Sequence, residues 1–446
     1  MKHIAFAIIA LSITIAVTGC HKNVDNPSPE PATENAVAAK QIEDFTNRKP
    51  FEYTITTDMD GDKENVEINV VMNLLNGQAK ARYDLDCNGD GEYEFVGLTN
   101  NQKCIYPRNS GTHQIWVRGE IPAMFLCTRN YVEDESLDDG KNDNISEEID
   151  DSKISIISID DWGDIEWMSM HAFAKECEKL NHIPEQAPNL SKVTDMSGLF
   201  RGATSFNQPL DNWDTANVKK LSWMFYKAVA FNQPLENWNT SNVTDMSGMF
   251  GDANAFNQPL EKWDTANVTD MSGMFYAATS FNQPLEKWNT SNVNKMNSMF
   301  TEATAFNQSL ENWNTSNVTE MNVMFWGATS FNQPLEKWDT KNVVEMNGMF
   351  SNATSFNQPL EKWNTANVKD MSLMFNSATS FDQPLEMWNI TKVCNMDFMF
   401  KDASNFNHYP MSWIVPSSKE MFAGTKVEQL SAEKPLKIVE KDACRK

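Results

Sequence analysis

Residues 242–263 read NVTDMSGMFGDANAFNQPLEKW, and close variants of this stretch recur along more than half of the chain. Its two phenylalanines and its tryptophan belong to three rows of aromatic residues spaced by 25 positions. These rows run from Phe200 to Phe400, from Phe206 to Phe406 and from Trp213 to Trp413, through nine registers without an insertion. A repeat of 20–50 residues is typical of solenoids, propellers and other arrays.

The apolar pattern of one repeat predicts a short helix followed by a short strand. In residues 243–250, the apolar side chains fall at relative positions 0, 3, 6 and 7, which is one face of a helix. Gly248 weakens this helix, so we expect only one or two turns. Residues 256–263 read as extended, because Pro259 forbids helix continuation. Neither element buries its apolar face alone, which predicts that neighbouring units stack into an α/β repeat solenoid.

The repeated Phe, Trp, Met and Val positions are predicted to form the core of this solenoid, not an aromatic cofactor site. A repeated asparagine, at Asn207, Asn232, Asn257 and equivalent positions, has two interpretations. It forms either an internal ladder that satisfies backbone groups at each bend or a ladder of exposed side chains.

The repeat resembles that of a known family. The segments NVTDMSGMF and ATSFNQPLEKW look like the 25-residue repeat of BspA-like bacterial surface lipoproteins, which are relatives of the leucine-rich repeats. The resemblance covers about residues 190–425. Upstream, Ala172-Phe173, Cys177, Leu180 and Ile183-Pro184 resemble the leucine-rich repeat's own pattern. The family implies surface display and protein binding, in some members to host matrix or blood proteins, and it implies no catalysis.

These patterns divide the chain into seven segments. They are a signal peptide (1–19), a flexible tether (20–48), a small β domain (49–130), an acidic linker (131–158), an N-terminal capping repeat (159–190), the solenoid (191–425) and a C-terminal cap or tail (426–446).

The first twenty residues read as an export signal. Residues 4–17 are apolar but too few to span a bilayer as a stable helix. They end in Val-Thr-Gly-Cys, which resembles a bacterial lipobox with Val17 in place of the usual Leu. This resemblance implies a diacylglycerol on Cys20, whereas ordinary cleavage near Gly19 would leave Cys20 unmodified. We therefore expect a lipid-anchored protein of the bacterial cell envelope. Because residue 21 is not Asp, the family's rule for retention in the inner membrane does not apply, and we expect the protein at the outer membrane or cell surface.

Alternating residues predict strands in the next segment. They occur at 51–55 and 66–70, with a further strand at 114–117, separated by turns rich in Asp and Gly. Short strands at this spacing indicate a β-sandwich. Residues 83–91 resemble the central hairpin of PKD-type, immunoglobulin-like modules.

The same hairpin matches half of a calcium loop. Asp84, Asp86, Asn88 and Asp90 are acidic or amide side chains at alternate positions, and a glycine follows Asn88. Position 12 of the loop is Phe95 instead of a bidentate Glu. A weak calcium site and a hairpin turn rich in Asx residues are therefore both open, and we expect no other cofactor.

Six cysteines besides Cys20 permit three disulfides in an exported chain. Cys87 with Cys104 is the favoured pair, since both flank strands of one small domain. Cys127 with Cys177 and Cys394 with Cys444 are weaker choices. The acidic residues of 133–151 form either a solvated linker or a patch for divalent cations.

Charge and motifs exclude several functions. A net charge of −24 argues against nucleic acid and against electrostatic docking on anionic lipid. No phosphate-binding loop, serine-hydrolase motif or zinc-protease motif occurs. We therefore expect a non-enzymatic, protein-binding solenoid whose partners are host or envelope proteins. The alternatives are a structural spacer of the envelope and a hydrolase with an unrecognised carboxylate pair.

Binding is expected where the repeats differ. The residue after the first Phe row is variable, and it is aromatic at Tyr226, Tyr276 and Trp326, in every second coil. These three rings predict an exposed ridge with the residue types of interaction hot spots. The alternative is that the rings pack against the next coil.

Overall fold

The computed structural model describes residues 45–57, 64–72, 81–127 and 155–439. The predicted signal peptide, Cys20 and nearly all of the tether lie outside the described residues, as does the acidic segment 131–154. Within the described residues, no helix is both long and apolar enough to cross a membrane.

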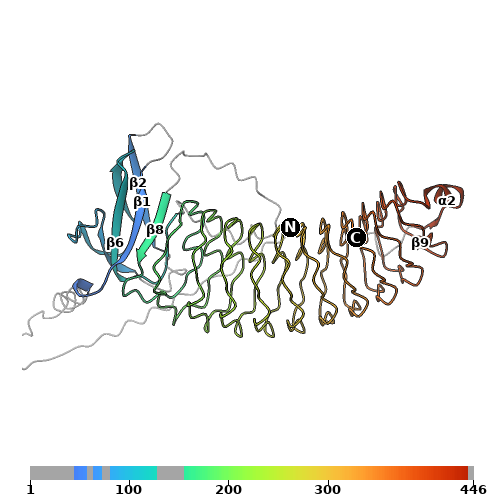
Figure 1. Cartoon of the computed structure of the whole chain (residues 1–446), viewed down its shortest axis with the longest axis horizontal. Coiled ribbons are helices and arrows are strands. Elements are labelled where there is room, and N and C mark those ends of the chain that lie inside the picture. Colours follow the sequence, from blue (N-terminus) through green and yellow to red (C-terminus); the bar gives the residue numbers. More distant parts are fainter. Residues whose placement is uncertain (1–44, 58–63, 73–80, 128–154, 440–446) are drawn as a thin grey trace, which may run out of the picture. The chain divides into compact units, whose positions relative to one another are not determined.

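The first domain is built from two antiparallel sheets (Figure 1). One sheet has the order β4-β3-β6-β1-β8 and the other the order β5-β2-β7. The strands are β1 (Phe51–Thr56), β2 (Asn65–Met72), β3 (Arg82–Asp86), β4 (Phe95–Leu98), β5 (Gln102–Pro107), β6 (Thr112–Glu120), β7 (Met124–Phe125) and β8 (Ser155–Asp161). Alternate residues of both sheets enter one core, as half-buried strands do.

One predicted domain boundary falls inside strand β8. The linker was expected to end at residue 158 and the capping repeat to begin at 159, but both positions lie inside β8. This strand pairs with β1 on one side, and Ser158 forms a parallel bridge with His182 of the capping repeat on the other. One strand therefore belongs to the β domain and to the end of the array.

The β domain covers the first coil of the array. Phe51 packs its ring 5.6 Å from Trp167 and 5.9 Å from Phe173, and Trp162 meets Trp213 of the first regular repeat at 5.8 Å. The amide of Leu126 donates to the carbonyl of Phe173 at 2.8 Å. Because an uncapped solenoid exposes its core at the end, this packing gives the array its N-terminal cap.

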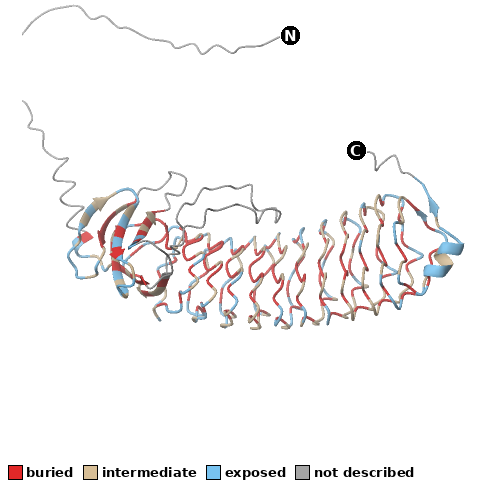
Figure 2. Cartoon of the chain, turned by 90° about the horizontal axis from the view of Figure 1, so that it is seen from above, coloured by how far each residue is buried: buried red, intermediate tan, exposed pale blue. Residues whose placement is uncertain are grey.

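The repeats form coils that stack along the chain, as the prediction of a solenoid requires (Figure 1). One residue of each coil forms a parallel bridge with the equivalent residue of the next. Figure 2 shows buried and exposed residues alternating around the coils. The bridging residues are Asp195, Lys220, Asp245, Asp270, Lys295, Glu320, Glu345, Asp370 and Asn395.

The predicted helix and strand of each repeat are wrong. Residues 246–253 form overlapping turns, and their amides alternate between two kinds of acceptor. Met249 donates to the carbonyl of Met246, three residues back, whereas Gly248 donates to Ser272 of the next coil at 2.8 Å. An α-helix would use every amide inside one segment. Apolar residues at relative positions 0, 3, 6 and 7 fit successive turns as well as a helix. The apolar pattern alone could therefore not distinguish a helix from a series of turns.

Two residues per coil have left-handed backbone, which an α-helix excludes. The first position has φ between 49° and 63° throughout the array, and the second lies four residues later. The first position is Gly198, Trp223, Gly248, Gly273, Ser298, Val323, Gly348, Leu373 and Phe398.

The prediction that the apolar rows form the core is confirmed. At the repeated core positions, the Phe, Met, Val and Leu side chains of the interior repeats are at most 2% exposed, and the Trp row is 3–4% exposed. The ring centroid of Phe250 lies 4.0 Å from that of Phe256 in the same coil and 5.7 Å from that of Phe275 in the next coil. From Trp238 to Trp388, each indole N–H donates to a leucine carbonyl of the preceding coil, as Trp288 does to Leu260 at 3.0 Å.

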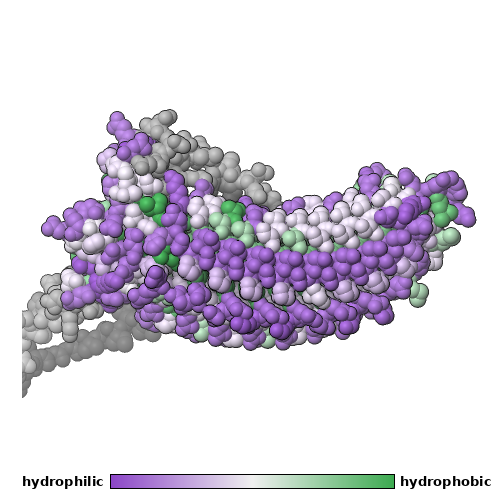
Figure 3. Space-filling model, in the orientation of Figure 1, coloured by the Kyte–Doolittle hydropathy of each residue, from purple (hydrophilic) through white to green (hydrophobic). Residues whose placement is uncertain are grey.

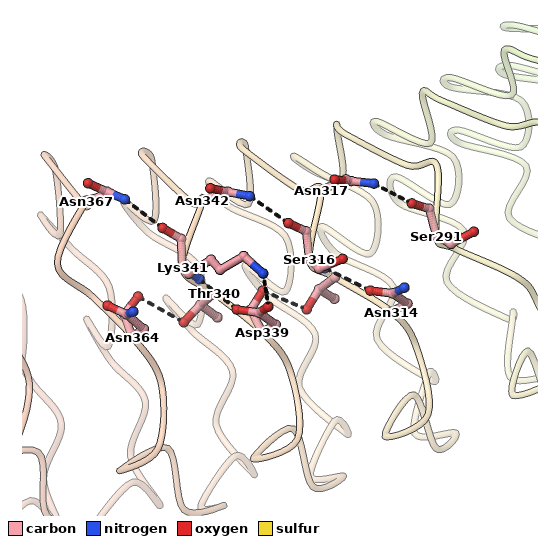
Figure 4. A network of polar contacts seen from close by, with 11 residues as sticks. Ser291, Asn314, Ser316, Asn317, Asp339, Thr340, Lys341, Asn342, Asn364 and Asn367 are labelled. Atoms are coloured by element: carbon pink, nitrogen blue, oxygen red, sulfur yellow. Dashed lines mark hydrogen bonds and ion pairs between the residues drawn. The ribbon is translucent and has the colours of Figure 1, made fainter.

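Polar ladders join the coils at the surface. The carboxamide oxygen of Asn232 accepts the amide of Asn257 at 3.0 Å, and the same contact recurs along the array. Most of these asparagines are half-buried. The ladder satisfies backbone donors as the internal interpretation required, but it lies at the surface. A second ladder joins Asn342 to the carbonyl of Ser316 at 2.7 Å (Figure 4).

The C-terminal end contains short elements. Strand β9 (Ile414–Val415) pairs in parallel with β10 (Lys437–Ile438), and α2 (Glu428–Glu433) lies between them in the sequence. Among the described residues, α2 is the one α-helix with both ends defined. The array is therefore built almost without helix.

Candidate functional site

The turn segments of successive coils form one surface, which we call the turn face. It contains the first left-handed position of each coil, defined above, and the variable position three residues later. The variable position is Arg201, Tyr226, Gly251, Tyr276, Thr301, Trp326, Ser351, Asn376 and Lys401. Because every repeat position gives a row, bands of similar hydropathy run along the coils (Figure 3).

The predicted ridge residues all lie on the turn face and are half-buried. Tyr226, Tyr276 and Trp326 alternate with small, buried residues at the same position. A Cβ atom placed on Gly251 would lie 2.6 Å from the ring of Tyr226, so this ring leans over the next coil. For Tyr226, the two alternatives of the sequence analysis therefore both hold in part: its ring contacts the next coil and keeps part of its surface exposed.

A second row of apolar side chains was missed by the sequence analysis. At the first left-handed position, glycine is replaced by Trp223, Val323, Leu373 and Phe398, with φ of 49–59°. Left-handed backbone costs a residue with a Cβ atom roughly 1–2 kcal/mol, and a β-branched residue such as Val323 is rare there. None of these four side chains is buried, and Leu373 is 41% exposed. The departures from glycine in the 25-residue register were the signal that could have revealed them.

The row of variable residues and the row of first left-handed positions both carry an aromatic ring in the second coil. The rings of Trp223 and Tyr226 are perpendicular, with centroids 5.0 Å apart. The guanidinium of Arg201 lies 5.7 Å from the Trp223 ring and 5.1 Å from the Tyr226 ring, and the ammonium of Lys227 lies 5.2 Å from the latter. All three distances suit cation–π attraction. The group forms a compact aromatic and cationic cluster.

Electrostatics keep the Tyr226 hydroxyl protonated at neutral pH. Burial, with the nearby Asp252 carboxylate, raises the pKa of Tyr226 to about 12. Burial also raises the pKa of Asp252, although the hydroxyl of Tyr226 donates a hydrogen bond to it. This hydrogen bond helps to fix the ring of Tyr226, which is half-buried.

Other sides of the coils carry exposed ion pairs. The ammonium of Lys262 lies 3.1 Å from the Glu236 carboxylate of the preceding coil, and Lys287 pairs with Glu261 in the same way. In the coils from Gly251 to Asn376, the variable position carries no charged residue. Since a charged rim around apolar anchors is typical of recognition surfaces, the turn face is the candidate binding surface.

The calcium candidates come together as a hydrogen-bonded turn. One carboxylate oxygen of Asp86 accepts the amides of Asn88 and Gly89, and the other accepts the amide of Gly91 at 2.8 Å. Asp84 accepts the amide of Gly97 and pairs with Arg118 at 3.1 Å.

The remaining candidates of this loop make similar contacts. The side chain of Asn88 accepts the amide of Asp90, and the side chain of Asp90 accepts the amide of Glu92. These contacts favour the Asx-rich turn, and the calcium site stays a hypothesis. Elsewhere too, the described residues contain no group of three His, Cys, Asp or Glu that could hold a metal ion.

Two disulfides join described cysteines. Cys87 is bonded to Cys104, the pair that the sequence analysis favoured, and links β3 to β5 across the two sheets. Cys127 is bonded to Cys177, which links the β domain to the capping repeat. Cys444, the suggested partner of Cys394, lies outside the described residues.

One pocket lies beside the β domain and has a volume of about 480 Å³. Its carboxylates are already engaged: Asp161 pairs with the Lys49 ammonium, and Asp164 accepts the Lys49 amide. The predicted hydrolase alternative gains no carboxylate pair from this pocket.

Stacked coils and an apolar core without helix define a tandem-repeat solenoid protein. The chain belongs to the family described as Mycoplasma protein of unknown function, DUF285. The family model matches residues 168–278, 258–347 and 331–433, so three overlapping matches cover most of the capping repeat and the whole array. No curated protein and no solved structure matches the chain.

Proposed function

We propose that the protein is a lipid-anchored adhesin of the bacterial cell envelope that binds other proteins through the turn face of its solenoid. Cys20 would carry the lipid, and residues 20–48 would hold the folded part away from the membrane. The resemblance of its repeats to those of BspA-like surface lipoproteins supports this proposal. In the same reading, the chain is not an enzyme.

One observation carries the proposal. Trp223, Val323, Leu373 and Phe398 occupy a left-handed position that glycine occupies without strain, and their side chains are not buried. Strained residues that do not fill the core point to a function, because stability alone would favour glycine there. Together with Tyr226, Tyr276 and Trp326 they supply large apolar anchors to one face, the residue types that dominate protein interfaces.

The first prediction concerns the ridge. Replacement of Tyr226, Tyr276 and Trp326 by Ala should weaken binding roughly 30-fold or more, because hot-spot anchors lose 2 kcal/mol or more on truncation. Affinity would be measured with the soluble chain, residues 21–446, against a panel of purified matrix, plasma and envelope proteins. Thermal unfolding would be recorded for each variant.

A second variant separates binding from folding. Val323→Gly with Leu373→Gly should leave the unfolding temperature unchanged or raise it, since glycine relieves the left-handed strain, yet it should weaken binding. The matched control, Lys262→Ala with Lys287→Ala, removes exposed charges from other rows and should leave affinity unchanged. If both turn-face variants bind as well as the unmodified chain, the turn face is not the binding surface, and the structural spacer becomes the better interpretation.

A further inference from the structure

The last coil departs from the repeat at five consecutive positions, residues 408–412. Where coils such as 258–263 read Gln-Pro-Leu-Glu-Lys-Trp, residues 408–413 read His-Tyr-Pro-Met-Ser-Trp. The Glu and Lys that form ion pairs elsewhere are replaced by Met411 and Ser412. The preceding coil has already lost its Lys, which is Met387. The polar rows of the array thus end before its C-terminal end.

A pocket of about 330 Å³ lies at this end of the array. One wall is formed by Tyr409 and residues 411–414, and the other by residues 434–437. The hydroxyl of Tyr409 donates to the carbonyl of Lys434 at 2.6 Å, and β9 pairs with β10. These contacts hold the two walls together, so the pocket is part of the fold.

An unsatisfied donor lines the pocket. In coils 238–388 each tryptophan indole N–H has a leucine carbonyl as acceptor. The indole nitrogen of Trp413 is buried and has no hydrogen-bond partner in the described part of the chain, although Trp413 is only 4% exposed. A buried donor without an acceptor is costly, so a ligand that brings an oxygen atom would gain affinity here.

The surroundings of the pocket are apolar and basic. Met411, which lines the pocket, is 65% exposed, and Ile438, which follows the lining residue Lys437, is 60% exposed. Lys434 and Lys437 line the pocket and are exposed. The last 46 residues contain eight Lys and Arg against six Asp and Glu, whereas the whole chain has a net charge of −24. This end therefore favours a ligand that is apolar and negatively charged.

A strand edge borders the same pocket. Among the described residues, β10 pairs with β9 alone, so its other side can accept an added strand. Extended peptides bind sheet edges through their backbone, and side-chain pockets give such binding its specificity.

We propose that this C-terminal pocket binds an extended peptide segment of a partner protein, with an apolar side chain next to a carboxylate. The apolar side chain would contact Met411 and Ile414, the carboxylate would face Lys434 and Lys437, and a peptide oxygen would accept from the Trp413 indole. This site is separate from the turn face and does not depend on its function.

The test uses a defined probe. Acetyl-Thr-Val-Thr-Val-Leu-Glu with a free terminal carboxylate is compared with the uncharged peptide that ends in Gln amide. The soluble chain carries ¹⁵N-labelled tryptophan, and Trp413→Phe assigns the indole signal of Trp413. We expect the acidic peptide to saturate binding and to shift that indole signal downfield, and the uncharged peptide to bind roughly tenfold more weakly.

Variants distinguish the contributions. Lys434→Glu with Lys437→Glu should weaken binding roughly tenfold or more by charge reversal. Lys337→Glu with Lys362→Glu is the matched control for net charge and should change affinity less than about twofold. Because all four lysines are exposed, these variants test the site even if Trp413→Phe does not fold.

Three results would each overturn the proposal. They are no shift of the Trp413 indole at about 1 mM peptide, equal binding of the acidic and uncharged peptides, and unchanged affinity after reversal of Lys434 and Lys437. Deletion of residues 440–446 is the last arm. A tenfold gain in peptide affinity from this deletion would identify the chain's own C-terminal residues as the occupant, which would also contradict a partner protein.

Discussion

Each residue of the repeat either stabilises the stacking of the coils or lies at their surface. The core residues stabilise the stacking. The indole of Trp288 lies 6.4 Å from that of Trp263 and 6.3 Å from that of Trp313, with the rings nearly parallel. Its N–H donates to the Leu260 carbonyl. Each tryptophan therefore contributes buried area and one contact between coils.

Removal of one such ring should be costly. Trp288→Ala is expected to lower the free energy of unfolding by about 3–5 kcal/mol, because it leaves a cavity between two fixed rings. Denaturant unfolding followed by circular dichroism measures this. Trp288→Phe keeps a ring, loses the hydrogen bond and should cost less. A loss below about 1 kcal/mol for the alanine variant would mean that the tryptophan row is not core.

Each coil is the structural element of the array, and its bridging residue is charged in nearly every register. Glu320, Glu345 and Asp370 occupy this position in three successive coils. Like charges that face each other on neighbouring strands are destabilising. Burial, with repulsion from Asp370, raises the pKa of Glu345.

This raised pKa predicts a pH-dependent gain for Glu345→Gln. A carboxyl whose pKa is higher in the folded than in the unfolded state favours folding when protonated, and that contribution is lost as pH rises through the folded-state pKa. Glu345→Gln should therefore stabilise the chain at pH 7, by a few tenths to about 1 kcal/mol. The gain should shrink as pH falls through the raised folded-state pKa of Glu345 and should be lost below the ordinary range for Glu. Thermal unfolding between pH 4 and pH 7 checks this.

Asp339 provides the opposite control. The ammonium of Lys341 donates to it and lowers the pKa of Asp339 (Figure 4). Its contribution to stability is present above the ordinary pKa and is lost as pH falls, so Asp339→Asn should destabilise slightly at pH 7. Equal shifts of the same sign in both variants would contradict the electrostatic explanation.

The folded molecule joins an end cap to a repeat array. The β domain shares β8 with the capping repeat and is tied to it by the Cys127–Cys177 disulfide. Its aromatic residues cover the first coil, so it protects one end of the core as terminal caps of solenoids do.

The anchor yields the last prediction. Cys20→Ala should release the protein from membranes or block its processing, because acyl chains supply the membrane affinity at about 0.8 kcal/mol per buried CH₂. Detergent-phase partitioning and labelling with a radioactive fatty acid measure this. Val17→Leu, which restores the usual lipobox residue, should leave partitioning intact. Unchanged partitioning of Cys20→Ala would exclude lipid attachment as the anchor.

The sequence by itself determined the 25-residue period and the identity of the core. Those properties follow from composition at fixed spacing: Phe, Trp and Met recur in register and must be buried somewhere, whatever the local backbone. The ridge at Tyr226, Tyr276 and Trp326 was predicted from variation at one repeat position, and it stays a prediction. The Cys87–Cys104 pair was favoured because two cysteines flank strands of one small domain.

Only the tertiary structure decided the local backbone. The turns of each coil exist because alternate amides, such as that of Gly248, find acceptors in the next coil, and no pattern within one repeat contains that information. The same stacking holds Trp223 and Val323 in left-handed backbone against their own preference. At the last coil, the indole N–H of Trp413 has no acceptor among the described residues. Contacts between residues 25 positions apart, not local propensity, supply the hydrogen bonds that fix this fold.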